Sequence, residues 1–290
     1  ITMRTEKEIR RLLLDTAAKD ERIRAAYLEG SRVFPDIPKD IFQDYDVVYV
    51  VKETTSFQRD TSWIDTFGER LYMQYPEDSI YYPSDKQNCY GWLMQFTDGN
   101  RIDLHVCTAE YALQHMDAYE ILLDKDGILP LPKEEAFQTF WIKKPSQEQF
   151  HCTCNEYWWS VNNVVKGLKR RELPYVMDII DFILRPMLKR LLEWTIGIAY
   201  DFQISAGKSG KYMEHLLPDS VYKSFLRTYM TADLDSCWQG VFHMNALFHE
   251  TAATVGKQLH LVYDEQEAVN SMKYAKDVYL LPEDAKEIYV

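Results

Sequence analysis

The sequence predicts an α/β N-terminal domain with a mixed sheet, followed by an all-α helical-bundle domain. Residues 45–51 form a run rich in β-branched side chains, which is typical of a buried strand. Residues 89–97 and 101–108 flank a Gly-containing turn, and two such runs around a turn predict a β-hairpin. From about residue 146 this pattern fades, and long stretches with apolar residues at helical spacing follow.

The other elements of the first domain follow from shorter patterns. Residues 5–20 carry apolar side chains at helical spacing, which predicts a helix. Residues 23–28 are a short apolar run that predicts a strand, and residues 70–75 are a weaker strand candidate. Together with the runs above, these patterns predict a sheet of roughly four to six strands before residue 130.

The second half of the chain predicts helices, and proline-containing segments separate it from the first half. We place the boundary after residue 130, giving domains 1–130 and 131–290, because residues 129–132 contain two prolines. Pro186 lies inside one of the helical patterns and should kink or split that helix. The helical patterns cover residues 147–171, 175–204, 219–230 and 235–262.

The composition is that of a globular protein with an acidic surface. Hydrophobic residues make up 46% of the chain, which is enough to build a core. The 33 basic and 45 acidic side chains leave a net charge of −12. Such a surface repels phosphate backbones, so we expect no nucleic acid partner, and it suits a cationic ligand.

The sequence also favours a cytoplasmic location and no association with a membrane. No stretch approaches the ~20 apolar residues of a membrane-spanning helix. The charged start at residues 1–8 lacks the apolar segment of a signal peptide. Five cysteines are an odd and sparse set in a chain of this length, which favours a reducing compartment over a disulfide framework.

The residues that point most clearly to chemistry lie between Gly30 and Asp46. Asp44 and Asp46 are two residues apart at the start of a predicted strand, so their carboxylates project from the same face. Two such carboxylates repel each other unless a cation lies between them, and hard oxygen ligands suit Mg²⁺. Gly30 allows the backbone to approach a ligand closely, and Ser31 adds a hydroxyl donor.

A third carboxylate, Asp103, follows the turn of the predicted hairpin. Its strand can lie beside the strand that begins with Asp44 and Asp46. The sequence therefore predicts a metal site made of these three aspartates.

Several segments of the chain carry a resemblance to known enzymes. They are Glu29-Gly30-Ser31-Arg32, Ile37-Pro38, Phe42-Gln43-Asp44-Tyr45-Asp46, Leu122-Leu123-Asp124-Lys125-Asp126, Trp141-Ile142-Lys143 and Val164-Val165-Lys166-Gly167-Leu168. The Gly-Ser and Asp-x-Asp motifs with a later Asp resemble the nucleotidyltransferase superfamily. The wider pattern is similar to the aminoglycoside 6-adenylyltransferases, the streptomycin adenylyltransferases of bacteria, over about residues 3–265.

The resemblance implies a reaction and a set of roles for the motif residues. The reaction is transfer of AMP from ATP to the 6-hydroxyl of streptomycin with release of pyrophosphate, which confers antibiotic resistance. Asp44 and Asp46 would hold the Mg²⁺ that bridges the triphosphate, and Gly30 and Ser31 would cradle its β- and γ-phosphates. Asp103 would complete a second metal site or take the proton from the sugar hydroxyl, and no transition metal is implied.

The resemblance further implies contacts from outside this motif. Lys166 is expected to contact a phosphate, and Arg32 is expected to contact a phosphate or to form a structural ion pair. Streptomycin is a polycation, so its site should offer carboxylates and aromatic faces. We expect these from Glu156 and Trp159, and Glu156 is an alternative to Asp103 as the general base.

Asp178 and Asp181, which share one face of a predicted helix, are further candidates for contacts with the drug. Two alternative functions stay open. In one, the nucleotide goes to another acceptor: a lincosamide, a different aminoglycoside or a protein side chain. In the other, the chain binds nucleotide without catalysis. The sequence predicts either a monomer or a homodimer.

Overall fold

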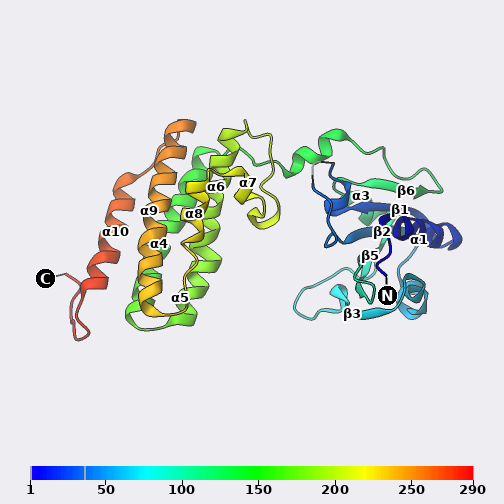
Figure 1. Cartoon of the computed structure of the whole chain (residues 1–290), viewed down its shortest axis with the longest axis horizontal. Coiled ribbons are helices and arrows are strands. Elements are labelled where there is room, and N and C mark those ends of the chain that lie inside the picture. The colour runs from blue at the N-terminus through cyan, green and yellow to red at the C-terminus, as the bar shows by residue number, and fades with distance from the viewer. Residues whose placement is uncertain (1, 36, 290) are drawn as a thin grey trace. The chain divides into compact units, whose positions relative to one another are not determined.

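The computed structural model describes residues 2–35 and 37–289, and the chain divides into two compact units, Ile1–Phe137 and Gln138–Val290 (Figure 1). The division therefore falls a few residues beyond the position that we proposed from the sequence. Phe137 packs edge-on against Phe34, with the ring centroids 4.9 Å apart, and this contact ties the segment after residue 130 to the first unit.

The first unit is built on a six-stranded mixed sheet with the order β3-β4-β5-β2-β1-β6. The central strands β2 and β5 are parallel, and every other neighbouring pair is antiparallel. The prediction of a mixed sheet is thus confirmed. The strands are β1 (Ile23–Glu29), β2 (Tyr45–Val51), β3 (Arg70–Gln74), β4 (Cys89–Phe96), β5 (Arg101–Thr108) and β6 (Glu120–Asp124).

Strand β2 is buried on both faces, as its β-branched composition predicts. Successive side chains of a strand point to opposite faces. Val47 therefore packs in the core that contains Ile9 of helix α1 (Glu6–Lys19), and Val48 packs in the core that contains Ala112 of helix α3 (Ala109–His115). A short helix α2 (Thr55–Arg59) follows β2. Burial on both faces fixes the start of β2, which carries two of the predicted site residues.

Strand β6 was not predicted from the sequence. It pairs with β1 in antiparallel orientation at the edge of the sheet, and its residues are at most partly buried. Its apolar run, residues 121–123, is much shorter than the run that made β2 recognisable. The six strands of the sheet fall within the predicted range of four to six, although no pattern had located the sixth strand.

Over residues 138–289 the second unit contains helices and no strand, which confirms the prediction of an all-α region. Its core includes a stacked pair of rings, Tyr157 and Phe248, with centroids 3.6 Å apart. Two helices were missed: α7, which has only four residues, and α10, in which small side chains such as Ala268 and Ala275 make up much of the buried face. The helices are α4 (Gln147–Lys169), α5 (Leu173–Ile179), α6 (Arg185–Ala199), α7 (Met213–Leu216), α8 (Asp219–Leu226), α9 (Leu234–Leu259) and α10 (Glu265–Leu280).

Pro186 does not interrupt the helical backbone. A π-helical segment, Ile180–Leu184, joins α5 to α6, and both Ile180 and Arg185 keep right-handed helical angles. Proline has no N–H to donate to the carbonyl four residues earlier, and a π turn is one way to absorb the lost bond. None of the helices within residues 2–35 and 37–289 is long and apolar enough to cross a membrane.

Candidate active site

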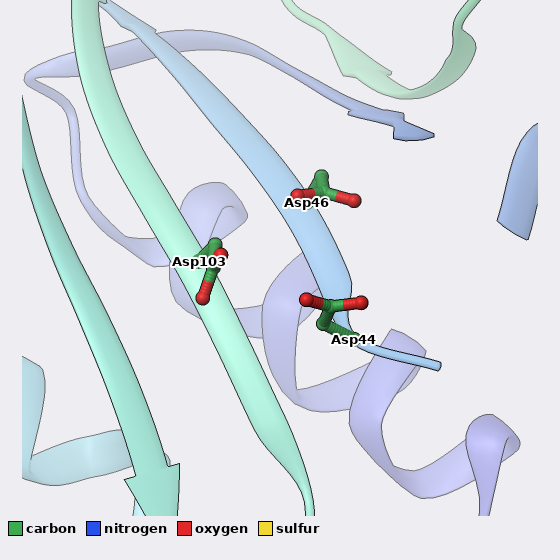
Figure 2. A group of neighbouring side chains, drawn as sticks. All are labelled: Asp44, Asp46 and Asp103. Atoms are coloured by element: carbon green, nitrogen blue, oxygen red, sulfur yellow. The ribbon is translucent and has the colours of Figure 1, made fainter. Parts of the chain in front are cut away.

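Three carboxylates converge at the centre of the sheet in the first unit. Asp46 of β2 lies directly opposite Asp103 of the parallel strand β5, and Asp44 immediately precedes β2. One oxygen from each carboxylate lies within 4.8 Å of an oxygen of the other two. Figure 2 shows the three side chains gathered on one side of the two strands. The strand arrangement that we predicted from the sequence therefore brings these residues together.

The chemistry of this cluster suits a divalent cation. Carboxylate oxygens are hard ligands, and three negative charges at this separation repel one another in the absence of a positive charge. Asp103 is buried, whereas Asp44 and Asp46 are partly exposed, so the cluster faces solvent from one side. The arrangement can hold a cation while leaving part of its coordination to a ligand that enters from solvent.

Arg101 supplies a positive charge to the same cluster. Its Nε and one terminal nitrogen donate to the two oxygens of Asp103, at 2.8 and 2.6 Å, and Nε lies 3.4 Å from Asp44. The hydrogen bonds to Asp103, together with the nearby charges of Asp44 and Asp46, raise the pKa of Arg101. Our sequence analysis missed this residue, although side chains two apart on a strand share one face.

Gly30 lies directly against Asp46. It has a φ of +72°, and a Cβ atom built on it would lie 1.9 Å from Asp46 Oδ2. A residue with a side chain would thus meet both a backbone penalty and a steric clash. Gly30 begins a 3₁₀ turn, Gly30–Val33, and Ser31 in this turn accepts a hydrogen bond from Gln43 Nε2 at 3.3 Å. The Gly-Ser motif therefore lies beside the carboxylates.

Arg32 holds the segment that leads into β2. Its Nε donates to the main-chain oxygen of Asp44 at 2.9 Å, and a terminal nitrogen donates to that of Gln43 at 2.6 Å. The guanidinium also lies over the ring of Tyr45, 3.7 Å from its centroid, and approaches Glu6 at 3.5 Å. These contacts are structural, and they fix the backbone from which the Asp44 side chain projects.

Glu29 is a fourth carboxyl group near the cluster. It lies opposite Asp46 in the pairing of β1 with β2. Burial, and secondarily the charges of Asp46 and Asp117, raise the pKa of Glu29 to about 7. Our sequence analysis recorded Glu29 in a family motif but gave it no role, because the pairing of β1 with β2 cannot be read from the sequence alone.

The remaining predicted site residues belong to the second unit. Lys166, Glu156 and Trp159 lie on α4, where Trp159 is 69% exposed and Glu156 accepts a hydrogen bond from Ser160 Oγ at 3.5 Å. Asp178 lies on α5 and is exposed.

Asp181 lies in the π segment, where it accepts a hydrogen bond from the buried Arg185 at 3.1 Å. The structure thus places Gly30, Ser31 and Arg32 beside the carboxylates, and it distributes the other candidates over α4, α5 and the π segment.

Comparison with known proteins identifies the family of this chain. The streptomycin adenylyltransferase family matches residues 3–278. An aminoglycoside 6-adenylyltransferase of Bacillus subtilis is 34% identical over 96% of this chain and 99% of that protein. One from Campylobacter jejuni is 36% identical over 91% of this chain and 93% of its own length.

A third aminoglycoside 6-adenylyltransferase, from Staphylococcus aureus, is 36% identical over 78% of this chain and 82% of its own length. A crystal structure of an aminoglycoside 6-adenyltransferase from Bacillus subtilis is 31% identical, covers 96% of this chain and 100% of that chain, and has a TM-score of 0.48. The family match over nearly the whole chain confirms the resemblance found in the motifs. It shows that this chain belongs to the streptomycin adenylyltransferase family.

Proposed function

We propose that this chain transfers AMP from ATP to the 6-hydroxyl of streptomycin, releases pyrophosphate, and so confers resistance to the drug. The observation that carries the proposal is the convergence of Asp44, Asp46 and Asp103 within 4.8 Å in a chain of this family. Its relatives named above are aminoglycoside 6-adenylyltransferases, which supports the choice of acceptor and of the hydroxyl.

The three aspartates would hold Mg²⁺, which supplies positive charge to the triphosphate and to the pyrophosphate that leaves. An all-carboxylate donor set that is open to solvent on one side supports this assignment, because Mg²⁺ commonly takes its remaining ligands from water and from substrate phosphates. The turn at Gly30 and Ser31 would bind the β- and γ-phosphates through its backbone amides and hydroxyl. Lys166 would add a point charge to a phosphate.

In-line transfer also needs the attacking hydroxyl to be held close to the α-phosphorus and to lose its proton. Both oxygens of Asp103 already accept hydrogen bonds from Arg101, which counts against Asp103 as the proton acceptor. Glu156 is exposed and accepts one long hydrogen bond, which supports it as the proton acceptor. Asp103→Asn should abolish Mn²⁺ binding, whereas Glu156→Gln should keep it and lower kcat.

Contacts with the drug are proposed for residues of the second unit. Trp159 offers an exposed ring, and Glu156 lies one turn before it on the same helix. Asp178 and Asp181 add carboxylates one turn apart. Carboxylates and aromatic faces are the groups that recognise guanidinium ions.

Pyrophosphate release from Mg·ATP with a panel of acceptors tests this function. We expect release with streptomycin and none with kanamycin or lincomycin, and Asp46→Asn should abolish it. Release with lincomycin or kanamycin in place of streptomycin would keep the chemistry and replace the acceptor. Binding of ATP without release with any acceptor would favour a nucleotide-binding protein that does not catalyse transfer.

We place the protein in the cytoplasm, where ATP is abundant. Its five cysteines are free thiols, which is typical of a reducing compartment. We expect no nucleic acid partner because of the net charge of −12. The oligomeric state is predicted to be either a monomer or a homodimer, and sedimentation equilibrium will distinguish the two.

A further inference from the structure

A cavity of about 590 Å³ lies in the helical unit. This volume falls in the range of small-molecule sites, roughly 300–1,000 Å³. Its walls come from three parts of the unit: the segment Phe140–Lys143 before α4, the first turns of α4, and the face of α6 that carries Arg190, Glu193 and Trp194. Residues 205–207 close the remaining side.

Aromatic rings make up much of this lining. Phe140 and Trp141 come from the segment before α4, and Trp194 comes from α6. Residue 142 of that segment is held in place, because the Ile142 backbone N–H donates to the oxygen of Ile204 at 2.8 Å. Aromatic faces attract organic cations by about 0.5–2 kcal/mol each. The cavity is therefore walled by groups that favour a flat or cationic ligand.

Glu193 is the carboxylate of the cavity that lacks a partner. Within the described part of the chain no hydrogen bond or ion pair is made to its side chain, although it is only partly exposed. Burial raises the pKa of Glu193, and the charges of Lys189 and Arg190 compensate for this only in part. A hydrogen-bonding cation that approaches a partly buried carboxylate of this kind stabilises its ionised form.

The two cations of the lining are directed to other groups. Lys143 Nζ donates to the main-chain oxygen of Gln138 at 2.8 Å, and a terminal nitrogen of Arg190 lies 3.4 Å from Thr153 Oγ1. Glu148, in the first turn of α4, adds a second carboxylate to the lining. The cavity thus offers two carboxylates and three aromatic rings to a ligand, and each of its two cations makes a hydrogen bond to a neutral oxygen.

From this lining we propose that the cavity binds a guanidinium or ammonium group of the aminoglycoside acceptor, with Glu193 as the counter-ion and Trp141 and Trp194 as the stacking surfaces. This inference rests on the proposed function for the choice of an aminoglycoside. It assigns part of the drug's binding energy to residues to which the sequence analysis gave no role, although Trp141 lies in one of the family motifs.

Cys152 allows a direct test on the unmodified protein. It lies on the wall of the cavity and is exposed, whereas Cys89, Cys107, Cys154 and Cys237 are buried. Alkylation of the native protein with iodoacetamide, followed by mass spectrometry, therefore reports on Cys152. We expect saturating streptomycin to slow this alkylation about tenfold or more, and a non-hydrolysable ATP analogue with Mg²⁺ to leave it unchanged.

Two variants connect the protection to Glu193. Glu193→Gln should lose most of the protection and raise the KM for streptomycin about tenfold, with kcat and the KM for ATP little changed. Glu250→Gln, on the exposed part of α9, should behave as the unmodified protein. A circular dichroism spectrum and a melting temperature of Glu193→Gln like those of the parent will show that it is folded.

The failures of the two proposals are distinguishable. If streptomycin supports pyrophosphate release but leaves Cys152 alkylation unchanged, the function stands and the cavity proposal is wrong. If the ATP analogue alone protects Cys152, the cavity belongs to the nucleotide and the proposal is again wrong. If streptomycin gives neither release nor protection, both proposals are wrong.

Discussion

Arg101 donates to both carboxylate oxygens of Asp103, at 2.8 and 2.6 Å, from a position two residues earlier on the same strand. The oxygens that a divalent cation needs from Asp103 are therefore the ones that the guanidinium uses. The same side chain lies 3.4 Å from Asp44. Arg101 lowers the mutual repulsion of the carboxylates, and it competes with any metal ion for them.

Arg101→Gln should therefore bind Mn²⁺ more tightly in the absence of nucleotide. Removal of one positive charge beside three carboxylates favours a cation, and we expect a gain of roughly tenfold, about 1.4 kcal/mol. Titration of the protein with Mn²⁺, followed by electron paramagnetic resonance, measures this. Arg59→Gln, an exposed arginine of α2, is the control and should leave the affinity unchanged. Weaker binding in Arg101→Gln would contradict the competition.

Gly30→Ala should remove activity as well as stability. The new Cβ would lie 1.9 Å from Asp46 Oδ2, so Asp46 must move away from the cluster. Gly99→Ala is a matched control, because Gly99 has a φ of +90° but no atom within 4 Å of the Cβ position. Both variants should lose about 1 kcal/mol of stability from the unfavourable backbone.

Only Gly30→Ala should also lose Mn²⁺ affinity and AMP transfer. Urea unfolding measures the free energy of unfolding of both variants. Titration with Mn²⁺ measures their metal affinity, and transfer of label from ATP measures their activity. Equal activity in the two alanine variants would show that the contact of Gly30 with Asp46 has no consequence for the site.

Arg32→Lys should weaken the metal site, although Arg32 does not contact the three carboxylates themselves and acts through the main chain of Gln43 and Asp44. A lysine cannot donate to the oxygens of Gln43 and Asp44 at once and also lie over Tyr45, as the guanidinium does. We expect a loss of about 1–3 kcal/mol in the free energy of unfolding, because a partly buried carbonyl loses its donor. Mn²⁺ affinity should fall as well. Unchanged Mn²⁺ affinity with lowered ATP affinity would instead support a phosphate contact.

Asp98 should make the stability of the first unit depend on pH. Burial would raise the pKa of Asp98, but hydrogen bonds donated by Arg4 and Asn100 outweigh it and hold the pKa well below its usual range. An aspartate in an unfolded chain has a pKa of about 3.9. The ionised form therefore contributes stability above about pH 4, and this contribution is lost as the pH falls below that value.

Asp98→Asn should thus cost about 1–3 kcal/mol at pH 7, with a smaller difference from the parent below pH 4. Urea unfolding at a series of pH values measures both, and Asp15→Asn, on the surface of α1, serves as the control. A cost of the same size at pH 3 and pH 7 would contradict the assignment to the ionised carboxylate.

The sequence was sufficient to predict the carboxylate cluster because its determinants are local. Asp44 and Asp46 are two apart at the start of a strand that is apolar on both faces, and Asp103 follows a hairpin turn. Strand β6 was not predicted, because its apolar run is only three residues long and the strand lies at the edge of the sheet, paired with β1. Helix α10 was missed because small residues dominate its buried face.

Features that depend on distant parts of the chain could not be predicted. The cavity of the helical unit brings together residues as distant in sequence as Trp141, Trp194 and Gly207. The burial of Arg32 against main-chain oxygens depends on the path of the segment before β2. At Pro186, where the sequence predicts a kink or a split, a π segment joins α5 to α6, and no sequence pattern indicated it.

The most direct test of the account is transfer of label from ATP labelled at the α-phosphate to streptomycin, measured in parallel for the unmodified chain and for Asp46→Asn. The account predicts labelled streptomycin with the unmodified chain in the presence of Mg²⁺. It predicts a loss of at least about a thousandfold in the variant, the size expected when a group that stabilises the transition-state charge is removed. Undiminished transfer by folded Asp46→Asn, or none by the unmodified chain while it binds ATP, would contradict the central claim.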